Sequence, residues 1–339
     1  MTLRARDEAD IVDAQIAFHL NAGVDFVIAL DHRSTDGTAE ILDSYASEGV
    51  LHLLRVPDEG IDRRWVTDMA RLAATDFGAD WVVNSDADEF WWPRGGSLKE
   101  VLSAVPERCG VVRAPWRQFV PRPDDGAFFA ERMVFRLSPF ASINSPSSPT
   151  SSYRPSVKVA HRADPRVRVA RGNHQLLEGP ARPLGWHPIE VLHFRLRSLA
   201  QCARKFANSW QAWSRKGGSD STTLIAAGHQ AQQQGALHDF YDSVAVGAGA
   251  LARGLESGSL VVDTRVRDAL RSLRLPAPVG ARAFALPGEK VLELPRPGLE
   301  DEARFAIDVD ALRDGSSVRL ARRLDLLAGR VTAVSGSLA

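Results

Sequence analysis

The sequence predicts an α/β protein in which a mixed sheet is flanked by helices and followed by a helical C-terminal region. Helical spacing and short apolar runs alternate over roughly the first 90 residues, which is typical of a mostly parallel sheet covered by helices. Strand-like segments between Pro- and Gly-containing loops follow, and helical spacing returns after residue 198. The 339 residues, 44% of them hydrophobic, suffice for one large core or for a main domain with a helical appendix.

The elements of the first half follow from the spacing of apolar residues. Apolar residues recur at helical spacing from Ile11 to Leu20, whereas the run from Val24 to Leu30 has the length of a buried strand. A polar turn follows, in which Thr35, Asp36 or Thr38 can cap the next helix, and capping is the role we expect for Asp36. The remaining segments, in chain order, are a helix over 39–46, a strand over 50–56, a helix over 62–77 and a strand that begins at 81.

The pattern changes after about residue 110. Residues 111–114 and 133–137 predict strands, for which we expect antiparallel pairing, and the Ser/Pro-rich tract within 138–155 predicts a surface loop. Residues 198–254 have helical spacing, and proline-marked turns follow. We therefore expect a first domain over 1–198, with halves at about 1–110 and 111–198, and a mostly helical extension over 199–339.

Composition narrows the class of protein. Lys+Arg and Asp+Glu both number 42, so nothing predicts a broad attraction to nucleic acid or to anionic lipid, and a charged ligand must be bound locally. Cys109 and Cys202 form neither a disulfide framework nor a metal-ligand spacing, which suits a reducing cytosol. Charges begin at Arg4, and no apolar stretch approaches the roughly 20 residues of a membrane span. We expect a cytoplasmic protein without a transmembrane segment, and peripheral membrane contact stays open.

The main candidate site is Asp86-Ala87-Asp88, where an apolar strand ends. Ligands of open α/β sheets bind at the carboxyl ends of the strands. Two carboxylates two residues apart can both turn toward a hard divalent cation that keeps positions free for diphosphate oxygens. Alone, the motif is also compatible with a simple turn cap. A calcium loop is disfavoured because no Gly stands at the sixth position.

A second carboxylate lies at the end of another predicted strand. Asp31 follows the apolar run that ends at Leu30, and the turn from Ser34 to Thr38 then begins a helix. Two strand ends of one sheet would form one crevice.

Together with Arg6-Asp7-Glu8-Ala9, these motifs resemble the family 2 type of glycosyltransferases, especially the subgroup with a D-x-D-E-F signature. The resemblance covers residues 1 to about 110. Asp7 stands where that family has Asn, and the first strand, over 1–6, is short.

The resemblance implies a GT-A nucleotide-diphospho-sugar transferase fold, whose mixed sheet is Rossmann-like, and it implies roles for individual residues. Asp31 would contact the nucleobase or ribose, and Asp86 would lie near the ribose or the metal. Asp88 would ligate the Mn²⁺ or Mg²⁺ ion that bridges the two phosphates. Arg6 and Glu8 would line the same pocket, although a solvated charge cluster is the alternative for this pair.

A second cluster resembles late motifs of the same subgroup; its members are Lys158, His161, Gly172-Asn173-His174 and the segment from His193 to Ser198. His193 is the best-placed third metal ligand because neutral imidazole binds such ions, although a buried structural histidine is nearly as good an interpretation. Lys158, Arg195 and Arg197 are candidates for binding the diphosphate. Gly172 would let the backbone approach the donor sugar, with a simple Gly turn as the alternative.

The resemblance predicts a hexosyltransferase-like enzyme that moves a sugar from a nucleoside-diphosphate sugar, with UDP- or GDP-sugars expected, to a carbohydrate or other hydroxyl acceptor. It implies inversion at the anomeric carbon, with a base that deprotonates the acceptor. The usual acidic pair is not evident, so the candidates for the base are His174, Glu131 and Glu178, in that order. Four aromatic residues after the D-x-D motif could stack on sugars, but the core is the expected place for most of them: Trp91, Trp92, Trp116 and Phe119.

Three other functions fit parts of the pattern. A nucleotidyltransferase of similar fold should carry a Gly-rich basic loop after the first strand, and residues 4–13 contain no Gly. A D-x-D phosphatase is disfavoured because Glu89-Phe90 replaces the context that such enzymes use. A non-catalytic protein that binds nucleotide sugars or carbohydrates stays open because the base is not located.

Overall fold

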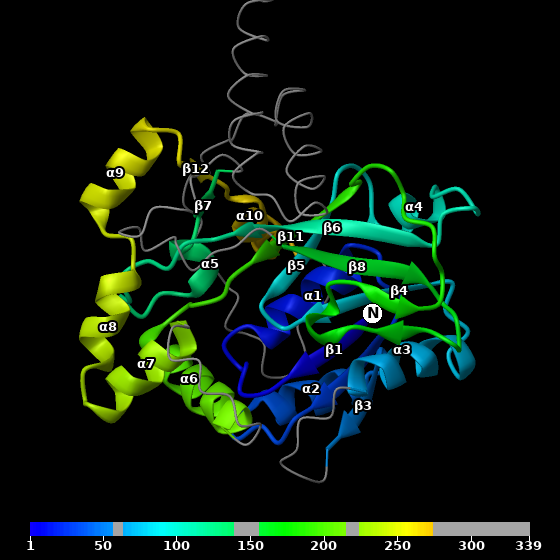
Figure 1. The fold of residues 1–339 in the computed structure, drawn as a ribbon, viewed down its shortest axis with the longest axis horizontal. Coiled ribbons are helices and arrows are strands. Elements are labelled where there is room, and N and C mark those ends of the chain that lie inside the picture. The colour runs from blue at the N-terminus through cyan, green and yellow to red at the C-terminus, as the bar shows by residue number, and fades with distance from the viewer. Residues whose placement is uncertain (57–63, 139–155, 215–223, 274–339) are drawn as a thin grey trace, which may run out of the picture.

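The computed structural model describes residues 1–56, 64–138, 156–214 and 224–273 (Figure 1). The predicted Ser/Pro loop, apart from Ser138, and residues 215–223 and 274–339 of the predicted extension lie outside these residues. One eight-stranded sheet dominates the fold, with the strand order β3-β2-β1-β4-β8-β6-β11-β5. Its strands are β1 (Thr2–Ala5), β2 (Val27–Asp31), β3 (Leu51–Arg55), β4 (Trp81–Asp86), β5 (Glu89–Pro93), β6 (Val111–Gln118), β8 (Val157–Arg162) and β11 (Ile189–His193).

Helices and two small sheets complete the described part of the chain. The small sheets pair β9 (Arg168–Val169) with β10 (Leu176–Glu178) and β7 (Phe135–Leu137) with β12 (Leu260–Val262). The helices are α1 (Val12–Asn21), α2 (Thr38–Ser47), α3 (Trp65–Thr75), α4 (Leu98–Ser103), α5 (Phe129–Arg132), the 3₁₀ turn η2 (Arg171–Asn173), α6 (Leu199–Ser214), α7 (Leu224–Gln233), α8 (Leu237–Val244), α9 (Ala248–Glu256) and α10 (Arg265–Arg271).

The sheet has a parallel half and a mixed half. Strands β3, β2, β1 and β4 pair in parallel, with Ala5 opposite Asp31 and Arg4 opposite Asp86. Strand β8 then pairs antiparallel with both β4 and β6, and β11 pairs parallel with β6 and antiparallel with β5. The predicted mixed sheet flanked by helices is therefore confirmed. The expected antiparallel pairing is confirmed for β6 with β8 and for β7 with β12, whereas β6 pairs in parallel with β11.

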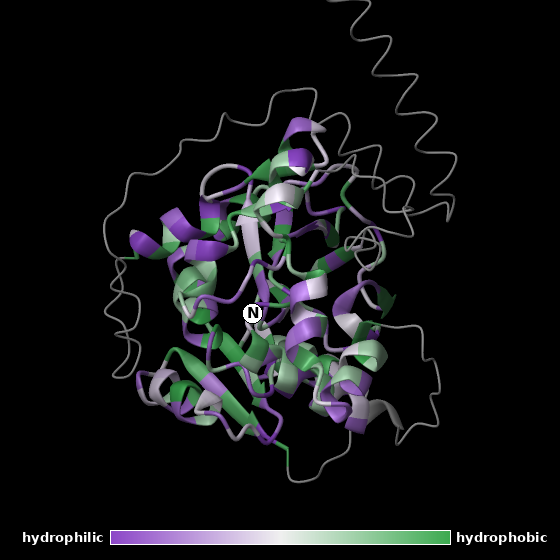
Figure 2. Ribbon diagram, turned by 90° about the vertical axis from the view of Figure 1, so that its left-hand side faces the viewer, coloured by the Kyte–Doolittle hydropathy of each residue, from purple (hydrophilic) through white to green (hydrophobic). Residues whose placement is uncertain are grey.

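Both faces of the parallel half are buried, which explains the nearly continuous apolar runs of its strands. Alternate residues of β2 face opposite ways: Val27 and Ala29 pack with α1 and α2, whereas Ile28 and Leu30 pack with α3. A third cluster lies under α4, around Trp91. Figure 2 shows this arrangement, with mostly green strands inside and helices that carry purple turns on the outside.

The helical region after residue 198 is confirmed for α6 to α9, which run along the left side of Figure 1 beside the main sheet. After α9 the chain packs against residues that precede 198. Strand β12 pairs with β7, and Val266 and Leu270 of α10 pack in the cluster that contains α1. The boundary at 198 stays a prediction. Within the described residues, no helix is both long and apolar enough to cross a membrane.

Candidate functional site

The topology brings the polar strand ends to one edge of the sheet. Parallel pairing places the ends of β1, β2 and β4 side by side, so Asp31 and Asp86 lie at the same edge. Strand β5 runs antiparallel to β11 in a register that sets Glu89 opposite His193. Because β8 is antiparallel to β4, its first residues, including Lys158, reach the same edge. Asp31, Asp86, Lys158 and His193, which the sequence singled out in its two halves, therefore lie at one edge.

The D-x-D motif forms the turn between β4 and β5. Asp86 ends β4, Ala87 is buried, and Glu89 begins β5. The carboxylate of Glu89 accepts a hydrogen bond of 3.1 Å from the backbone N–H of Asp86, which closes the turn. The two aspartates consequently have different surroundings, and each has its own cationic partner.

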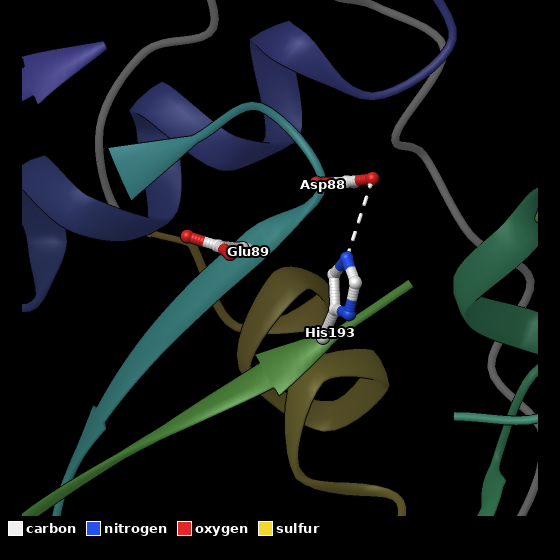
Figure 3. Close-up of side chains that lie close together, drawn as sticks. All are labelled: Asp88, Glu89 and His193. Carbon is white, nitrogen blue, oxygen red and sulfur yellow. Dashed lines mark ion pairs between the residues drawn. The ribbon is translucent and has the colours of Figure 1, made fainter. Parts of the chain in front are cut away.

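Asp88 faces His193 across the end of the sheet. Asp88 Oδ2 lies 3.5 Å from His193 Nε2, and Figure 3 shows Glu89 directed away from the line that joins them. His193 Nδ1 lies 2.7 Å from Gln118 Oε1, so the ring donates from Nδ1 and keeps the lone pair of Nε2 toward Asp88. Trp116 stacks on the imidazole at 4.4 Å. Burial lowers the pKa of His193, which favours the neutral ring.

This pair fits a divalent cation. Adjacent ligands about 2.1 Å from an octahedral ion lie roughly 3 Å apart, so a small movement would let Asp88 and His193 share one ion. The ring orientation is already set by Gln118, as in metal sites where the second ring nitrogen is hydrogen-bonded. Glu89 has a ligand atom within 4.8 Å of those of Asp88 and His193, and it is the third member of the group.

Glu89, however, already has several partners. Lys158 Nζ lies 2.8 Å from Glu89 Oε1, and the indole N–H of Trp116 donates to the same oxygen at 3.0 Å. Burial raises the pKa of Glu89 to about 8, against the opposing effect of Lys158. We therefore assign Glu89 to holding the turn together with Lys158 and Trp116.

Lys158 also neutralises Asp86. Its side chain is 0% exposed, and its Nζ lies 2.6 Å from Asp86 Oδ2, while Arg4 approaches the other oxygen at 3.6 Å. Burial would raise the pKa of Asp86, but Lys158 and Arg4 outweigh it and lower the pKa. Asp86 is therefore an anion at neutral pH.

The sequence did not single out Lys205, which completes the site. This residue lies on α6, and its Nζ donates to Asp88 Oδ2 at 2.6 Å and to the carbonyl of Arg195 at 2.9 Å. Burial would raise the pKa of Asp88, but the ammonium group of Lys205 outweighs burial and lowers the pKa well below its usual value. Only the three-dimensional contact identifies Lys205, because helical spacing does not say which neighbour a polar face meets.

The loop after β1 is held by Arg197. This guanidinium is 0% exposed, donates to Asp10 at 2.7 and 2.9 Å, and also bonds Glu8. Burial raises the pKa of Glu8 to about 7, with Arg197 opposing the rise. Because both carboxylates already bind its guanidinium, we assign Arg197 to positioning this loop instead of to a diphosphate. Asp10 was not foreseen as its partner.

The loops after β1 and β2 bind each other. The N–H of Asp7, a residue with φ of 54°, donates to Ser34 Oγ at 3.0 Å, and Asp7 Oδ1 accepts from the N–H of Thr35 at 2.7 Å. Asp31 Oδ1 accepts from the N–H of Ser34 at 3.2 Å. Gly37 is the N-cap residue of α2, and Asp36 stands just before it, where its Oδ1 accepts from the N–H of Thr38, the first residue of the helix. Asp36 therefore bonds the start of α2, as expected, but from outside the cap position itself. Arg6 donates to Gln211 of α6 at 3.3 Å.

The three candidate bases lie in different surroundings. His174 Nδ1 contacts the carbonyl of Val157 at 2.8 Å, and its ring meets Trp116 edge-on at 5.3 Å. Glu131 of α5 pairs with an arginine of α10, and Glu178 of β10 pairs with one of β9. Because Trp116 also stacks on His193, its ring connects His174 to the Asp88 site.

Other expectations concern aromatic residues and a histidine. Trp91 and Phe119 are buried in the core, as expected, whereas Trp116 belongs to the site. His161 is buried within β8, its Nδ1 faces the carbonyl of Arg162, and its pKa is lowered by burial, so its place is structural.

Comparison with known proteins gives a family match for the first part of the chain. Residues 5–116 match the model of glycosyltransferase family 92, and this segment contains Asp31 and the D-x-D turn. The expected resemblance to glycosyltransferases is thereby confirmed at that coarser level, and the family 2 type assignment stays a prediction. No curated protein sequence is significantly similar to the chain.

Among solved structures, S. aureus TarS is similar at low identity. One crystal structure is 14% identical with a TM-score of 0.30, and the match covers 72% of this chain and 48% of that one, about half its length. The structures of TarS 1-349 in complex with UDP and with UDP-GlcNAc are both 12% identical, with TM-scores of 0.29 and 0.31. Each match covers 94% of this chain, and 91% and 92% of theirs. At these TM-scores the similarity assigns no role to individual residues.

Proposed function

We propose that the protein transfers a sugar from a nucleoside-diphosphate sugar to a hydroxyl acceptor. The observation that carries the proposal is the glycosyltransferase family 92 match over the segment that contains Asp31 and the D-x-D turn. The second support is geometric, because Asp88 in the turn between β4 and β5 faces His193 at the end of β11. A UDP- or GDP-sugar is the donor that we expect from the sequence motifs.

In this proposal the interlocked loops after β1 and β2 bind the nucleoside end of the donor, with Asp31 and Arg6 at that end. The diphosphate lies toward the D-x-D turn. Asp88 and His193 would hold Mn²⁺ or Mg²⁺, which would offset the charge that develops on the departing diphosphate. Gln118 keeps Nε2 of His193 directed at the ion, because its Oε1 accepts the proton of Nδ1.

His174 is the base that we propose for the acceptor hydroxyl. Its Nδ1 donates to the carbonyl of Val157, which leaves the lone pair of Nε2 to accept a proton. Burial lowers the pKa of His174, so the ring is neutral and competent as a base at pH 7. Attack of the acceptor oxygen from the side opposite the diphosphate would invert the anomeric carbon, while the proton of the hydroxyl passes to Nε2.

Binding of nucleoside diphosphates tests the donor site. We would titrate wild type, Asp88→Ala and the control Asp43→Ala with UDP, GDP, ADP and CDP by calorimetry, with Mn²⁺ and with EDTA. Asp43 is an exposed carboxylate paired with Arg55 on the surface, so it matches the lost charge away from the site. The proposal predicts Mn²⁺-dependent binding that Asp88→Ala abolishes and Asp43→Ala retains. Absence of binding to every diphosphate in wild type would refute it.

Turnover assays on the same wild-type protein distinguish the proposed transferase from the alternative functions. Consumption of a nucleoside triphosphate with a sugar phosphate would indicate a nucleotidyltransferase. Tight binding of a nucleotide sugar that is neither hydrolysed nor transferred to any acceptor would indicate a binding protein that lacks turnover. Release of the nucleoside diphosphate with a transferred sugar supports the transferase.

A further inference from the structure

Lys205 lies where a cation bound to Asp88 would lie. Its Nζ is 2.6 Å from Asp88 Oδ2, the same oxygen that lies 3.5 Å from His193 Nε2. The carbonyl of Arg195 completes a set of oxygen partners at 2.9 Å. A carboxylate and a carbonyl oxygen are ligands that hard divalent cations also prefer. The ammonium group and a metal ion would therefore use the same atoms.

The two cations exclude each other for electrostatic reasons. Asp88 is buried and Lys205 is only 22% exposed, so solvent screens their charges weakly. An ammonium within hydrogen-bond distance of a metal-bound oxygen would place like charges a few ångströms apart in a medium of low dielectric constant. Binding of the metal to Asp88 consequently requires that Nζ leave Oδ2.

Lys205 is one of several residues that bind α6 to the sheet edge, and Arg204 beside it lies 3.5 Å from Asp36. Asn208 donates to Asp7 Oδ2 at 2.6 Å, and Gln211 accepts from Arg6. Residues 205, 208 and 211 recur every third position, so they line one side of the helix. Figure 1 shows α6 lying beside the ends of the strands. A movement of Lys205 thus alters the contact between α6 and the loop that we assign to the donor.

We propose that Lys205 is an internal counter-cation that a divalent metal ion displaces from Asp88, and that this exchange loosens α6 at the donor site. In the metal-free protein Lys205 neutralises Asp88. Only molecules in which the Lys205–Asp88 contact is broken can bind the metal, so the apparent affinity for the metal is the intrinsic affinity multiplied by the fraction of such molecules. The inference rests on the proposed function through its metal site. It adds that α6 responds to occupation of that site.

Binding of Mn²⁺ alone tests the exchange, with no nucleotide and no turnover. Electron paramagnetic resonance titration would compare wild type, Lys205→Met and the control Lys99→Met, whose lysine forms an exposed 2.6 Å pair with Asp25. The inference predicts that Lys205→Met binds Mn²⁺ at least tenfold more tightly than wild type, while Lys99→Met is unchanged. Equal or weaker binding by a folded Lys205→Met would overturn it.

Hydrogen exchange gives a second readout whose main comparison, wild type with and without Mn²⁺, does not depend on the folding of a variant. Addition of Mn²⁺ should speed exchange of the amides of α6 in wild type and leave them unchanged in Asp88→Asn. Unchanged protection of α6 in a wild type that binds Mn²⁺ would contradict the exchange. Absence of Mn²⁺ binding in wild type and in every variant would also overturn it, while release of a nucleoside diphosphate with transfer of its sugar would still support the proposed function separately.

Discussion

Asp13 carries a destabilising charge in the core, and its removal should stabilise the protein in a pH-dependent way. The residue lies in the first turn of α1, and its Oδ1 accepts a hydrogen bond of 2.7 Å from Tyr45, whereas Oδ2 is buried without a hydrogen-bond partner among the described residues. Burial raises the pKa of Asp13 from 3.8 to about 6. Deprotonation of Asp13 therefore costs more free energy in the folded than in the unfolded chain. The resulting loss in the free energy of unfolding increases as the pH rises above 3.8.

The size of the effect follows from the difference in pKa. Because one pKa unit corresponds to about 1.4 kcal/mol, the charged carboxylate lowers the free energy of unfolding by about 3 kcal/mol at pH 8. At about pH 4.5 the folded Asp13 is mostly protonated, and the cost is only about 1 kcal/mol. Asp13→Asn keeps an oxygen for Tyr45 and removes the charge. Its advantage over wild type should therefore grow by about 2 kcal/mol between these pH values.

Urea unfolding, followed by tryptophan fluorescence at several pH values, measures this difference. Only the change with pH is diagnostic, because a constant offset reports the packing of the new amide. Asp43→Asn is the matched control, since Asp43 is an exposed carboxylate in a surface ion pair worth less than about 1 kcal/mol. A gap between Asp13→Asn and wild type that stays constant from about pH 4.5 to 8 would refute the reasoning.

Three further predictions concern the site and its support. Gln118→Leu should weaken Mn²⁺ binding by roughly 10- to 100-fold, because His193 loses the partner that sets its tautomer, and unchanged affinity in a titration would contradict this. Glu190→Ala should lower the free energy of unfolding, measured with urea, by about 3–5 kcal/mol, because Glu190 is the buried carboxylate that pairs with Arg117 and Arg265 and its loss leaves their charges uncompensated. A loss below about 1 kcal/mol would show that these buried ion pairs do not stabilise the fold. His174→Gln should lower the rate of sugar transfer by about 10²- to 10⁴-fold with little change in diphosphate affinity, and an unaltered rate would exclude the proposed base.

Much of the fold could be predicted because local periodicity determines it. Apolar residues from Ile11 to Leu20 at helical spacing become α1, and the apolar run that ends at Leu30 becomes β2. Asp31 and the D-x-D motif could be assigned to strand ends, and parallel pairing then places them at one edge. These inferences need only the chain order and the direction of the strands.

The remaining contacts depend on long-range register, which local patterns do not contain. The reversal after Asp88 makes β5 a separate strand antiparallel to β11, and only this pairing sets Glu89 opposite His193. Gln118 reaches His193 because β6 and β11 are parallel neighbours. Lys205 lies on a helix whose spacing was evident, but nothing in that spacing names Asp88 as its partner.

Release of a nucleoside diphosphate from nucleotide sugars tests the central claim most directly. We would incubate wild type, Asp88→Asn and the control Asp43→Asn with UDP- and GDP-sugars in Mg²⁺ and Mn²⁺, and quantify the diphosphate by chromatography with and without a panel of sugar acceptors. The account predicts release by wild type and Asp43→Asn that EDTA suppresses, a loss of at least roughly 100-fold in Asp88→Asn, and faster release with a suitable acceptor. Wild-type protein that binds neither donor nor diphosphate, or release that is equal in Asp88→Asn, would contradict the account.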